Sequence, residues 1–242
     1  MVVKLLKQYL SPEQVSNYLR RHHQVRASHE TIYRYLYSDK SRTQAMKPYL
    51  RQGKRVRRKC YGSGARASLI PNRVSIHERP TIVEEKRRIG DWECDTVIGQ
   101  DRKSALVTLV ERKSLFTLMA IVKRKTAKQV SRAMIRLLKP YEEKVKTLTF
   151  DNGTEFMLHE KVANALSAKT YFANPYASWE RGINENTNGL IRQFSPKGTN
   201  FNQVDSKEVK TVLTLINNRP RKTRKYQSPN EIFNHQFVPL LT

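Results

Sequence analysis

Two stretches near the N-terminus show the apolar spacing of short helices. In the first, Ser11 precedes a Pro-Glu-Gln sequence, which places Ser at the N-cap, Pro at the first helical position and Gln at the third, as in a capping box. After a break at residues 22–26, Ser28 can cap a second helix, HETIYRYLY, whose apolar residues recur at helical intervals. Two short helices joined by a tight break predict a helix-turn-helix, with a plain helical hairpin as the alternative.

From Gly90 onward the pattern becomes that of strands alternating with helices. The runs WECDTVIG, ALVTLVE and LFTLMAIV are separated by short polar turns, which predicts an antiparallel meander. A helix ending at Pro140, a strand VKTLTF, a helix EFMLHEKVANAL capped by Thr154, a strand KTYFA and a final helix WERGINENTNGLIRQF follow. The order βββαβαβα predicts an α/β fold, with a mixed five-stranded sheet and helices on its faces.

The length of 242 residues allows one core domain and a smaller one. We expect a helix-turn-helix DNA-binding segment in residues 1–40, a basic linker in 41–84 and the α/β core in 85–242. The linker contains a dense cationic run followed by Gly and Ser. We expect it to be a solvated tether that also follows a phosphate backbone, for which the candidates are Lys54, Arg55, Arg57 and Arg58.

The chain is strongly basic. Its 46 Lys and Arg residues against 21 Asp and Glu give a formal net charge of +25 and a pI of about 10.3. This charge favours a polyanionic partner, and nucleic acid is the leading candidate, although basic proteins without catalytic activity share the same balance. Two cysteines, Cys60 and Cys94, form no metal-binding pair and are too few for a disulfide framework. No signal peptide or apolar run of about 20 residues is visible, so we expect a cytoplasmic protein without membrane contact.

Three acids are the candidate catalytic and metal-binding residues: Asp95 in a strand, Asp151 at the end of an apolar run, and Glu185 in a helix. Carboxylates from different elements suit Mg²⁺, with Mn²⁺ as a substitute, and predict a two-metal phosphoryl-transfer site. Each has an alternative reading. Strand alternation places Glu93 on the face of Asp95, an Asp-Asn-Gly sequence is commonly only a turn, and a Glu beside basic residues is commonly an exposed ion pair.

Several basic and aromatic residues are candidate DNA contacts. In the helix-turn-helix reading, His29, Tyr33 and Arg34 face the major groove. In the last helix of the core, Arg181, Glu185, Asn188 and Arg192 share one face. Candidates for phosphate contacts in and after this helix, with solvated charge as the alternative, are Arg181, Arg192, Lys197, Arg219 and Arg221.

Four segments carry a family resemblance: WECDTVIG, FDNGTEF, TYFANPYASWERGINENTNGLIRQFSPKGTNF and TLINNRPRKTRKYQSPNEIF. They resemble the catalytic core of bacterial insertion-sequence transposases of the IS-thirty type, over roughly residues 8–236. The resemblance implies a DDE enzyme with an RNase H-like, integrase-type core that uses Mg²⁺ to cut element ends and join them to target DNA. By the same resemblance the catalytic acids are Asp95, Asp151 and Glu185, whereas Glu93 and Glu155 either have structural roles or support the catalytic acids from behind. It also implies double-stranded DNA as partner and a homo-oligomer on DNA, in the bacterial nucleoid.

The sequence departs from the family pattern in two places. Family members are usually longer, with a further helix-turn-helix segment ahead of the one described above, so we expect a form shortened at its N-terminus. Glu180 stands where a neutral Gln is usual. The short start leaves one alternative open, a DNA-binding regulator or remnant of a transposase that performs no productive transposition. A stand-alone RNase H-like nuclease is a further alternative.

Overall fold

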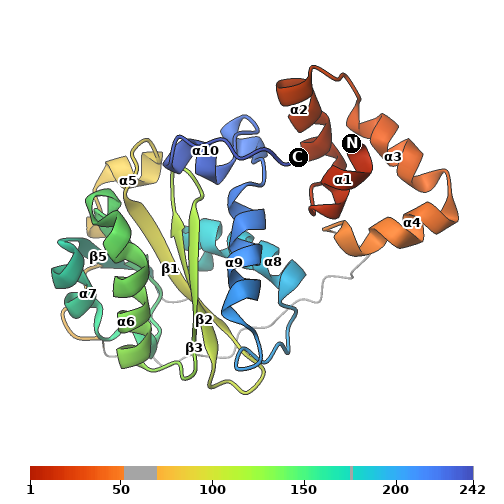
Figure 1. The fold of residues 1–242 in the computed structure, drawn as a ribbon. Helices are drawn as coiled ribbons and strands as arrows, with labels where there is room; N and C mark the ends of the chain where they lie inside the picture. Colours follow the sequence, from red (N-terminus) through yellow and green to blue (C-terminus); the bar gives the residue numbers. More distant parts are fainter. Residues whose placement is uncertain (52–69, 175–176, 242) are drawn as a thin grey trace. The chain divides into compact units, whose positions relative to one another are not determined.

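The computed structural model describes residues 1–51, 70–174 and 177–241, and their contacts form two compact units (Figure 1). One unit contains residues 1–51 and 215–241, and the other contains residues 70–174 and 177–214. This division differs from the expected boundaries, because the end of the chain groups with the N-terminal helices. Gln14 Nε2 donates to Pro220 O at 2.7 Å, and Arg21 pairs with Glu231 at 2.9 Å.

The first unit begins with four helices, α1 (Val2–Lys7), α2 (Pro12–His23), α3 (His29–Tyr37) and α4 (Lys40–Met46), followed by the 3-10 turn η1 (Lys47–Tyr49). The predicted capping box is present at the start of α2, where Ser11 Oγ accepts from Gln14 N. Ser28 Oγ accepts from Thr31 N at the start of α3, also as predicted. The helices α4 and η1 occupy part of the expected linker. Buried apolar side chains form the core of this unit: Leu5, Leu6, Leu10, Val15, Tyr18, Leu19, Ile32, Leu36 and Met46.

The C-terminal part of the same unit contains the end of α9 (Ser206–Asn217), the 3-10 turn η6 (Lys222–Arg224) and α10 (Pro229–Phe233). Helix α10 begins with a further capping box, in which Ser228 Oγ accepts from Glu231 N. Phe233 is 1% exposed and Pro229 is buried, so this short helix is held by apolar packing as well as by its cap.

The second unit contains a five-stranded sheet formed by β1 (Asp91–Ile98), β2 (Ala105–Glu111), β3 (Thr117–Val122), β4 (Thr147–Phe150) and β5 (Lys169–Phe172). The order across the sheet is β3-β2-β1-β4-β5. Strands β1, β2 and β3 are antiparallel, whereas β4 is parallel to both β1 and β5. The predicted meander and mixed sheet are therefore confirmed, and this topology is the RNase H-like arrangement.

Helices and turns connect the strands and extend the sheet unit. They are η2 (Ile76–Glu78), α5 (Thr81–Glu85), α6 (Ala127–Leu138), η3 (Lys139–Lys144), η4 (Thr154–Phe156), α7 (His159–Leu166), η5 (Ser178–Arg181), α8 (Gly182–Phe194) and the start of α9. Strand alternation places successive side chains of β1 on opposite faces, as predicted. Trp92 Nε1 donates to Lys144 O on one face, and Glu93 accepts from Asn184 N of α8 on the other.

Two helix starts differ from their predictions. Thr154 does not cap the helix after Asp151: it begins η4 without a side-chain cap, and α7 begins at His159. The adjacent Glu155 and Phe156 are both buried, so this segment makes a separate turn before the helix starts. Similarly, Arg181 ends the turn η5 and is not part of the regular helix that carries Glu185.

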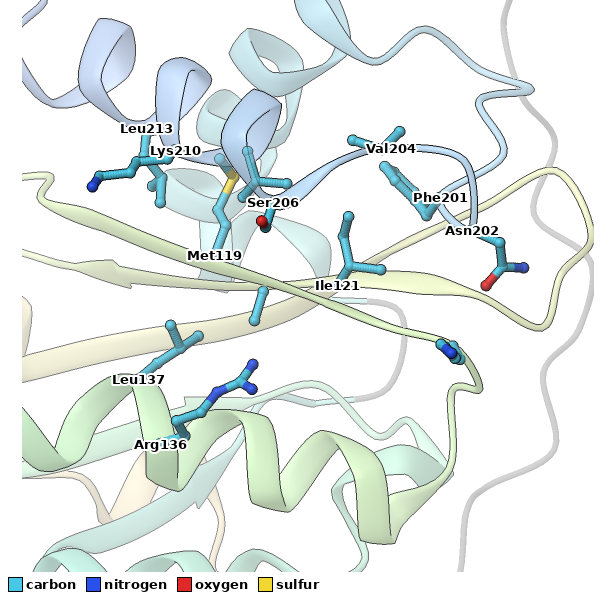
Figure 2. Close-up of a pocket in the computed structure, with 13 residues that line it drawn as sticks. Met119, Ile121, Arg136, Leu137, Phe201, Asn202, Val204, Ser206, Lys210 and Leu213 are labelled. Atoms are coloured by element: carbon cyan, nitrogen blue, oxygen red, sulfur yellow. The ribbon is translucent and has the colours of Figure 1, made fainter.

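A groove of about 400 Å³ crosses the edge strand β3 between α6 and α9 (Figure 2). Its floor is apolar, with Ile121, Leu137 and Leu213 among the lining side chains, and its rim contains Lys123, Arg136 and Lys210. None of the residues that line it is acidic, so this groove is not a site for carboxylate-bound metal. Within residues 1–51, 70–174 and 177–241, no helix has both the length and the apolar character needed to cross a membrane.

Candidate active site

Two of the three predicted acids come together because β1 and β4 are neighbouring parallel strands. Glu93 of β1 is paired with Thr149 of β4. Two residues further along both strands, the same register reaches Asp95 and Asp151, and side chains two residues apart on a strand share a face. Strand β4 ends at Phe150, so Asp151 is the first residue beyond it. Both carboxylates thus point to the face that α8 contacts.

Asp95 is held in place by two hydrogen bonds. Its Oδ1 accepts from Thr96 N and its Oδ2 accepts from the side-chain amide of Asn188 in α8, both at 2.8 Å. Burial raises the pKa of Asp95, the nearby Arg181 guanidinium lowers it, and the Asp151 carboxylate raises it. Burial and the neighbouring carboxylate thus oppose ionisation of Asp95, and the Arg181 guanidinium favours it.

Asp151 shares a counter-charge with Asp95. Its Oδ1 accepts from Gly153 N at 2.9 Å, and its Oδ2 accepts from Arg181 Nη2 at 3.3 Å. Arg181 Nη1 lies 3.8 Å from Asp95 Oδ1 and donates to Cys94 O at 3.3 Å. The side chains of Asp95 and Asp151 are 18% and 35% exposed, so the pair is accessible to a ligand.

Glu185 is exposed in the first half of α8. It precedes Asn188 by three residues, so the two side chains project from neighbouring positions on the helix surface. Among the side chains that the structure describes, no cluster of three or more His, Cys, Asp or Glu could hold a metal ion. The structure thus brings two acids of the predicted triad together and places the third on the adjacent helix.

Glu93, the alternative to Asp95, is fully engaged in a buried network. Its Oε1 accepts from Arg112 Nη1 at 2.6 Å and its Oε2 accepts from Asn184 N at 3.1 Å. Burial raises the pKa of Glu93 and Arg112 lowers it. Arg112 also donates to Glu84 at 2.9 Å, and the network borders a polar hollow of about 750 Å³ beside the start of α8. These contacts give Glu93 a structural role.

Two further glutamates lie near the site. Glu155 is buried, and its Oε1 accepts from Thr96 Oγ1 at 2.8 Å and from Lys125 Nζ at 3.1 Å. It therefore ties the turn after Asp151 to β1. Glu180 accepts from the backbone N–H of Asn174 at 2.8 Å and from its side-chain amide at 3.0 Å. The partners of Glu155 come from distant segments, so the sequence contains no local signal for them.

The donor set fits a hard divalent cation. Asp95, Asp151 and Glu185 offer only carboxylate oxygens, which Mg²⁺ and Mn²⁺ prefer. The space between the two aspartates already accommodates positive charge, because the Arg181 guanidinium lies against both of them. A third carboxylate on the neighbouring helix and exposed oxygens at the aspartates are compatible with a cation that also binds substrate phosphates.

The predicted DNA contacts differ in their accessibility. His29, Tyr33 and Arg34 are exposed on α3, and the rings of Tyr33 and Tyr37 stack at a centroid distance of 6.0 Å. Lys197 is exposed after α8. The predicted contacts Lys54, Arg55, Arg57 and Arg58 lie outside the described residues.

Three other predicted contacts are engaged inside the protein. Arg192 donates to the backbone carbonyls of Ile98 and Pro196, both at 3.2 Å. Arg219 and Arg221 are 4% and 7% exposed, and burial lowers their pKa values to about 10 and about 9. Their burial argues against the prediction that they contact DNA phosphates. Arg219 and Arg221 are buried because the C-terminal segment that carries them packs on the N-terminal helices of the same unit.

Three proteins of known name to which the chain is similar are all transposases of insertion sequence elements. The chain is 44% identical over 232 residues to the transposase for insertion sequence element IS4351 of Bacteroides fragilis, which covers 96% of this chain and 71% of that protein. It is 38% identical over 242 residues to transposase InsI for insertion sequence element IS30A of Escherichia coli (strain K12), covering 96% and 63%. It is 34% identical over 239 residues to the transposase for insertion sequence element IS1086 of Cupriavidus metallidurans, covering 96% and 70%.

The chain therefore spans between 63% and 71% of the length of these three relatives. No protein-family model matches it. Among solved structures, the catalytic core domain of BIV integrase is similar, with a TM-score of 0.48 and 21% identity, covering 61% of this chain and 95% of that one.

Proposed function

Since this chain belongs to the IS30 family of insertion-sequence transposases, we propose that it cuts DNA at the ends of an insertion sequence and joins the freed ends to target DNA. Asp95, Asp151 and Glu185 are the catalytic acids of this proposal. The relatives are transposases, which favours this activity over that of a regulator without catalysis.

The observation that carries the proposal is the meeting of Asp95 and Asp151. They are far apart in the sequence, yet the register of β1 and β4 brings their carboxylates to one face, where both contact Arg181. Neighbouring carboxylates repel each other and lower the stability of the fold unless a cation lies between them. Such pairs are therefore found mainly at functional sites. Such a pair at the end of a parallel strand suits a phosphoryl-transfer site.

In this proposal, Asp95, Asp151 and Glu185 hold Mg²⁺ or Mn²⁺. When bound, such ions activate an attacking hydroxyl and stabilise the charge on the leaving oxygen. The residues of the chain set the geometry. Asn188 fixes Asp95 Oδ2, and the Gly153 N–H fixes Asp151 Oδ1, so the two carboxylates are oriented before substrate arrives.

The reaction consists of two phosphoryl transfers. In the first, water attacks the phosphorus at the element end, the P–O3′ bond breaks, and a free 3′-hydroxyl and a 5′-phosphate result. In the second, that 3′-hydroxyl attacks a phosphodiester of target DNA and displaces the 3′-oxygen of the target strand. Each step exchanges one P–O bond for another, so neither a nucleotide cofactor nor a covalent enzyme intermediate is required.

The partner in this proposal is double-stranded DNA, held by basic and aromatic side chains. On α3, the exposed His29, Tyr33 and Arg34 are suited to the major groove. Lys197, exposed after α8, provides a phosphate contact. We propose that two or more copies assemble on paired ends.

The test is cleavage of a labelled duplex that carries the candidate element end, with Mg²⁺ or Mn²⁺ and a target plasmid present. Three neutral variants are compared with the native protein: Asp95→Asn, Asp151→Asn and Glu185→Gln. The matched control is Glu143→Gln, because Glu143 is an exposed acid of the same unit that lies in η3, before the start of β4, whereas Asp151 follows the end of that strand.

We expect metal-dependent cutting and joined products with the native protein and the control. Each of the three variants should lower cleavage by more than about 100-fold. If Glu185→Gln still cuts DNA, Glu185 is not one of the catalytic acids. Cutting without joined products would indicate a nuclease rather than a transposase. DNA binding without cutting in the native protein would support the regulator.

A further inference from the structure

Arg181 occupies the space between the two catalytic aspartates. Its Nη2 donates to Asp151 Oδ2 at 3.3 Å, and its Nη1 lies 3.8 Å from Asp95 Oδ1. The side chain is 14% exposed and comes from the turn η5, immediately before α8. One guanidinium therefore balances two carboxylates that would otherwise repel each other.

The oxygens that face Arg181 are those that a metal ion would need. Asp95 Oδ2 is held by Asn188, and Asp151 Oδ1 is held by the Gly153 N–H. The guanidinium faces the other two oxygens, Asp151 Oδ2 and Asp95 Oδ1, of which Asp95 Oδ1 also accepts from Thr96 N at 2.8 Å. A divalent cation and Arg181 thus compete for the same two oxygen atoms. Both are positively charged, so electrostatic repulsion opposes their binding there together.

The contacts of Arg181 are longer than those of the structural arginines in the same unit. Arg112 donates to Glu93 at 2.6 Å, and Arg88 donates to both oxygens of Asp91 at 2.9 Å. Charge-assisted hydrogen bonds of about 2.7–2.9 Å are the strong ones. The distances of 3.3 and 3.8 Å fit a counter-ion that can be displaced.

We propose that Arg181 is the resident counter-ion of the metal-free site and that metal binding releases it to contact a DNA phosphate. This inference rests on the proposed function and adds an order of events to it. Arginine binds phosphate through the same planar array of donors that it offers to a carboxylate. Metal binding and DNA binding are then coupled through one side chain, and each strengthens the other.

The first experiment measures Mn²⁺ binding by the full chain without DNA, from the electron paramagnetic resonance signal of free Mn²⁺. The variants are Arg181→Gln and Arg181→Lys, with Arg132→Gln as the control, because Arg132 is an exposed arginine on α6. We expect Arg181→Gln to bind Mn²⁺ about tenfold more tightly than the native protein. The lysine variant and the control should stay within about twofold of the native protein.

The second experiment measures the affinity for duplex DNA with and without Ca²⁺, a divalent ion used here to allow binding to be measured apart from cutting. The native protein should bind DNA more tightly with Ca²⁺ than without it. In Arg181→Gln, the free-energy gain in DNA affinity that Ca²⁺ produces should be smaller by at least about half. Circular dichroism spectra of each variant establish that the fold is retained.

Equal or weaker Mn²⁺ binding by Arg181→Gln overturns the inference, and so does an undiminished effect of Ca²⁺ on its DNA affinity. Asp151→Asn distinguishes this failure from a failure of the proposed function, because it removes a predicted metal ligand and should abolish Mn²⁺ binding. If Asp151→Asn binds Mn²⁺ as well as the native protein does, the metal site itself is wrongly assigned.

Discussion

Arg112→Met tests whether the buried charge network supports the site. Arg112 and Glu93 have side chains that are 3% and 1% exposed and lie 2.6 Å apart. Methionine keeps most of the side-chain volume but leaves the Glu93 carboxylate buried without its charged partner. Breaking one side of such a pair costs about 3–5 kcal/mol. The second pair, to Glu84, adds little because the Glu84 side chain is 58% exposed.

The cost of this substitution should depend on pH. Burial already raises the pKa of Glu93 in the folded state, and Arg112 counteracts that rise. A carboxyl group with a raised folded-state pKa favours the folded state fully below its unfolded pKa, and this contribution is lost as the pH rises through the folded pKa. Removing Arg112 raises the folded pKa of Glu93 further, so the deficit in unfolding free energy should be largest at neutral and alkaline pH.

Urea unfolding followed by tryptophan fluorescence measures this deficit. Both tryptophans, Trp92 and Trp179, lie between residues 70 and 214, and Trp92 is fully buried, so the signal reports on the unit that contains the sheet. We expect a deficit of about 3–5 kcal/mol near pH 8 that becomes clearly smaller near pH 5. The control Arg132→Met, at an exposed position, should change the unfolding free energy by less than about 0.5 kcal/mol.

A double variant isolates the charge. Arg112→Met combined with Glu93→Gln places a neutral amide where the carboxylate was, so it should recover at least about 1 kcal/mol near pH 8 and lose the pH dependence. A deficit below about 1 kcal/mol for the single variant, or one that is the same at both pH values, would refute the reasoning.

Three further substitutions have defined outcomes. Gly153→Ala places a Cβ 2.5 Å from Glu155 Oε2 and 2.9 Å from Asp151 Oδ1, so it should cost about 1–3 kcal/mol in urea unfolding and lower cleavage; unchanged values would contradict the crowding. Asn188→Ala removes the hydrogen bond to Asp95 and should lower cleavage about 10–100-fold with little change in fold, as circular dichroism and product yield will show. Ser11→Ala removes the capping box of α2 and should destabilise that helical unit by about 1 kcal/mol in thermal unfolding followed at helical wavelengths.

Local patterns were sufficient to predict the five strands of the sheet and the helices α2, α3, α6, α7 and α8. The capping residues Ser11 and Ser28 mark the starts of α2 and α3 because a hydroxyl that satisfies free backbone N–H groups acts within one turn. Period-two alternation likewise placed Glu93 and Asp95 on one face of β1. The prediction that Thr154 caps a helix is wrong because packing, and not the local pattern, decides the structure there. Glu155 and Phe156 are buried in a separate turn, and the helix begins later.

The roles of the acids depend on partners that local patterns do not contain. Glu93 and Asp95 are equivalent in the alternation of β1, and they differ only because Arg112 comes from the end of β2 and Asn188 from α8. The burial of Arg219 similarly results from packing of the chain end on the N-terminal helices. Sequence charge alone made that residue a candidate for DNA contact.

The order of the strands explains why the site needs an internal cation. Strands β2 and β3 and helix α6 separate β1 from β4 in the sequence, yet parallel pairing brings Asp95 and Asp151 to matched positions. Hydrogen bonds from Asn188 and from the Gly153 N–H hold the two carboxylates close together, so a nearby cation lowers their repulsion when no metal is bound. The turn η5 supplies that balance through Arg181, next to the helix that carries Glu185. In the proposed metal site, the apparent metal affinity would therefore include the cost of displacing this arginine.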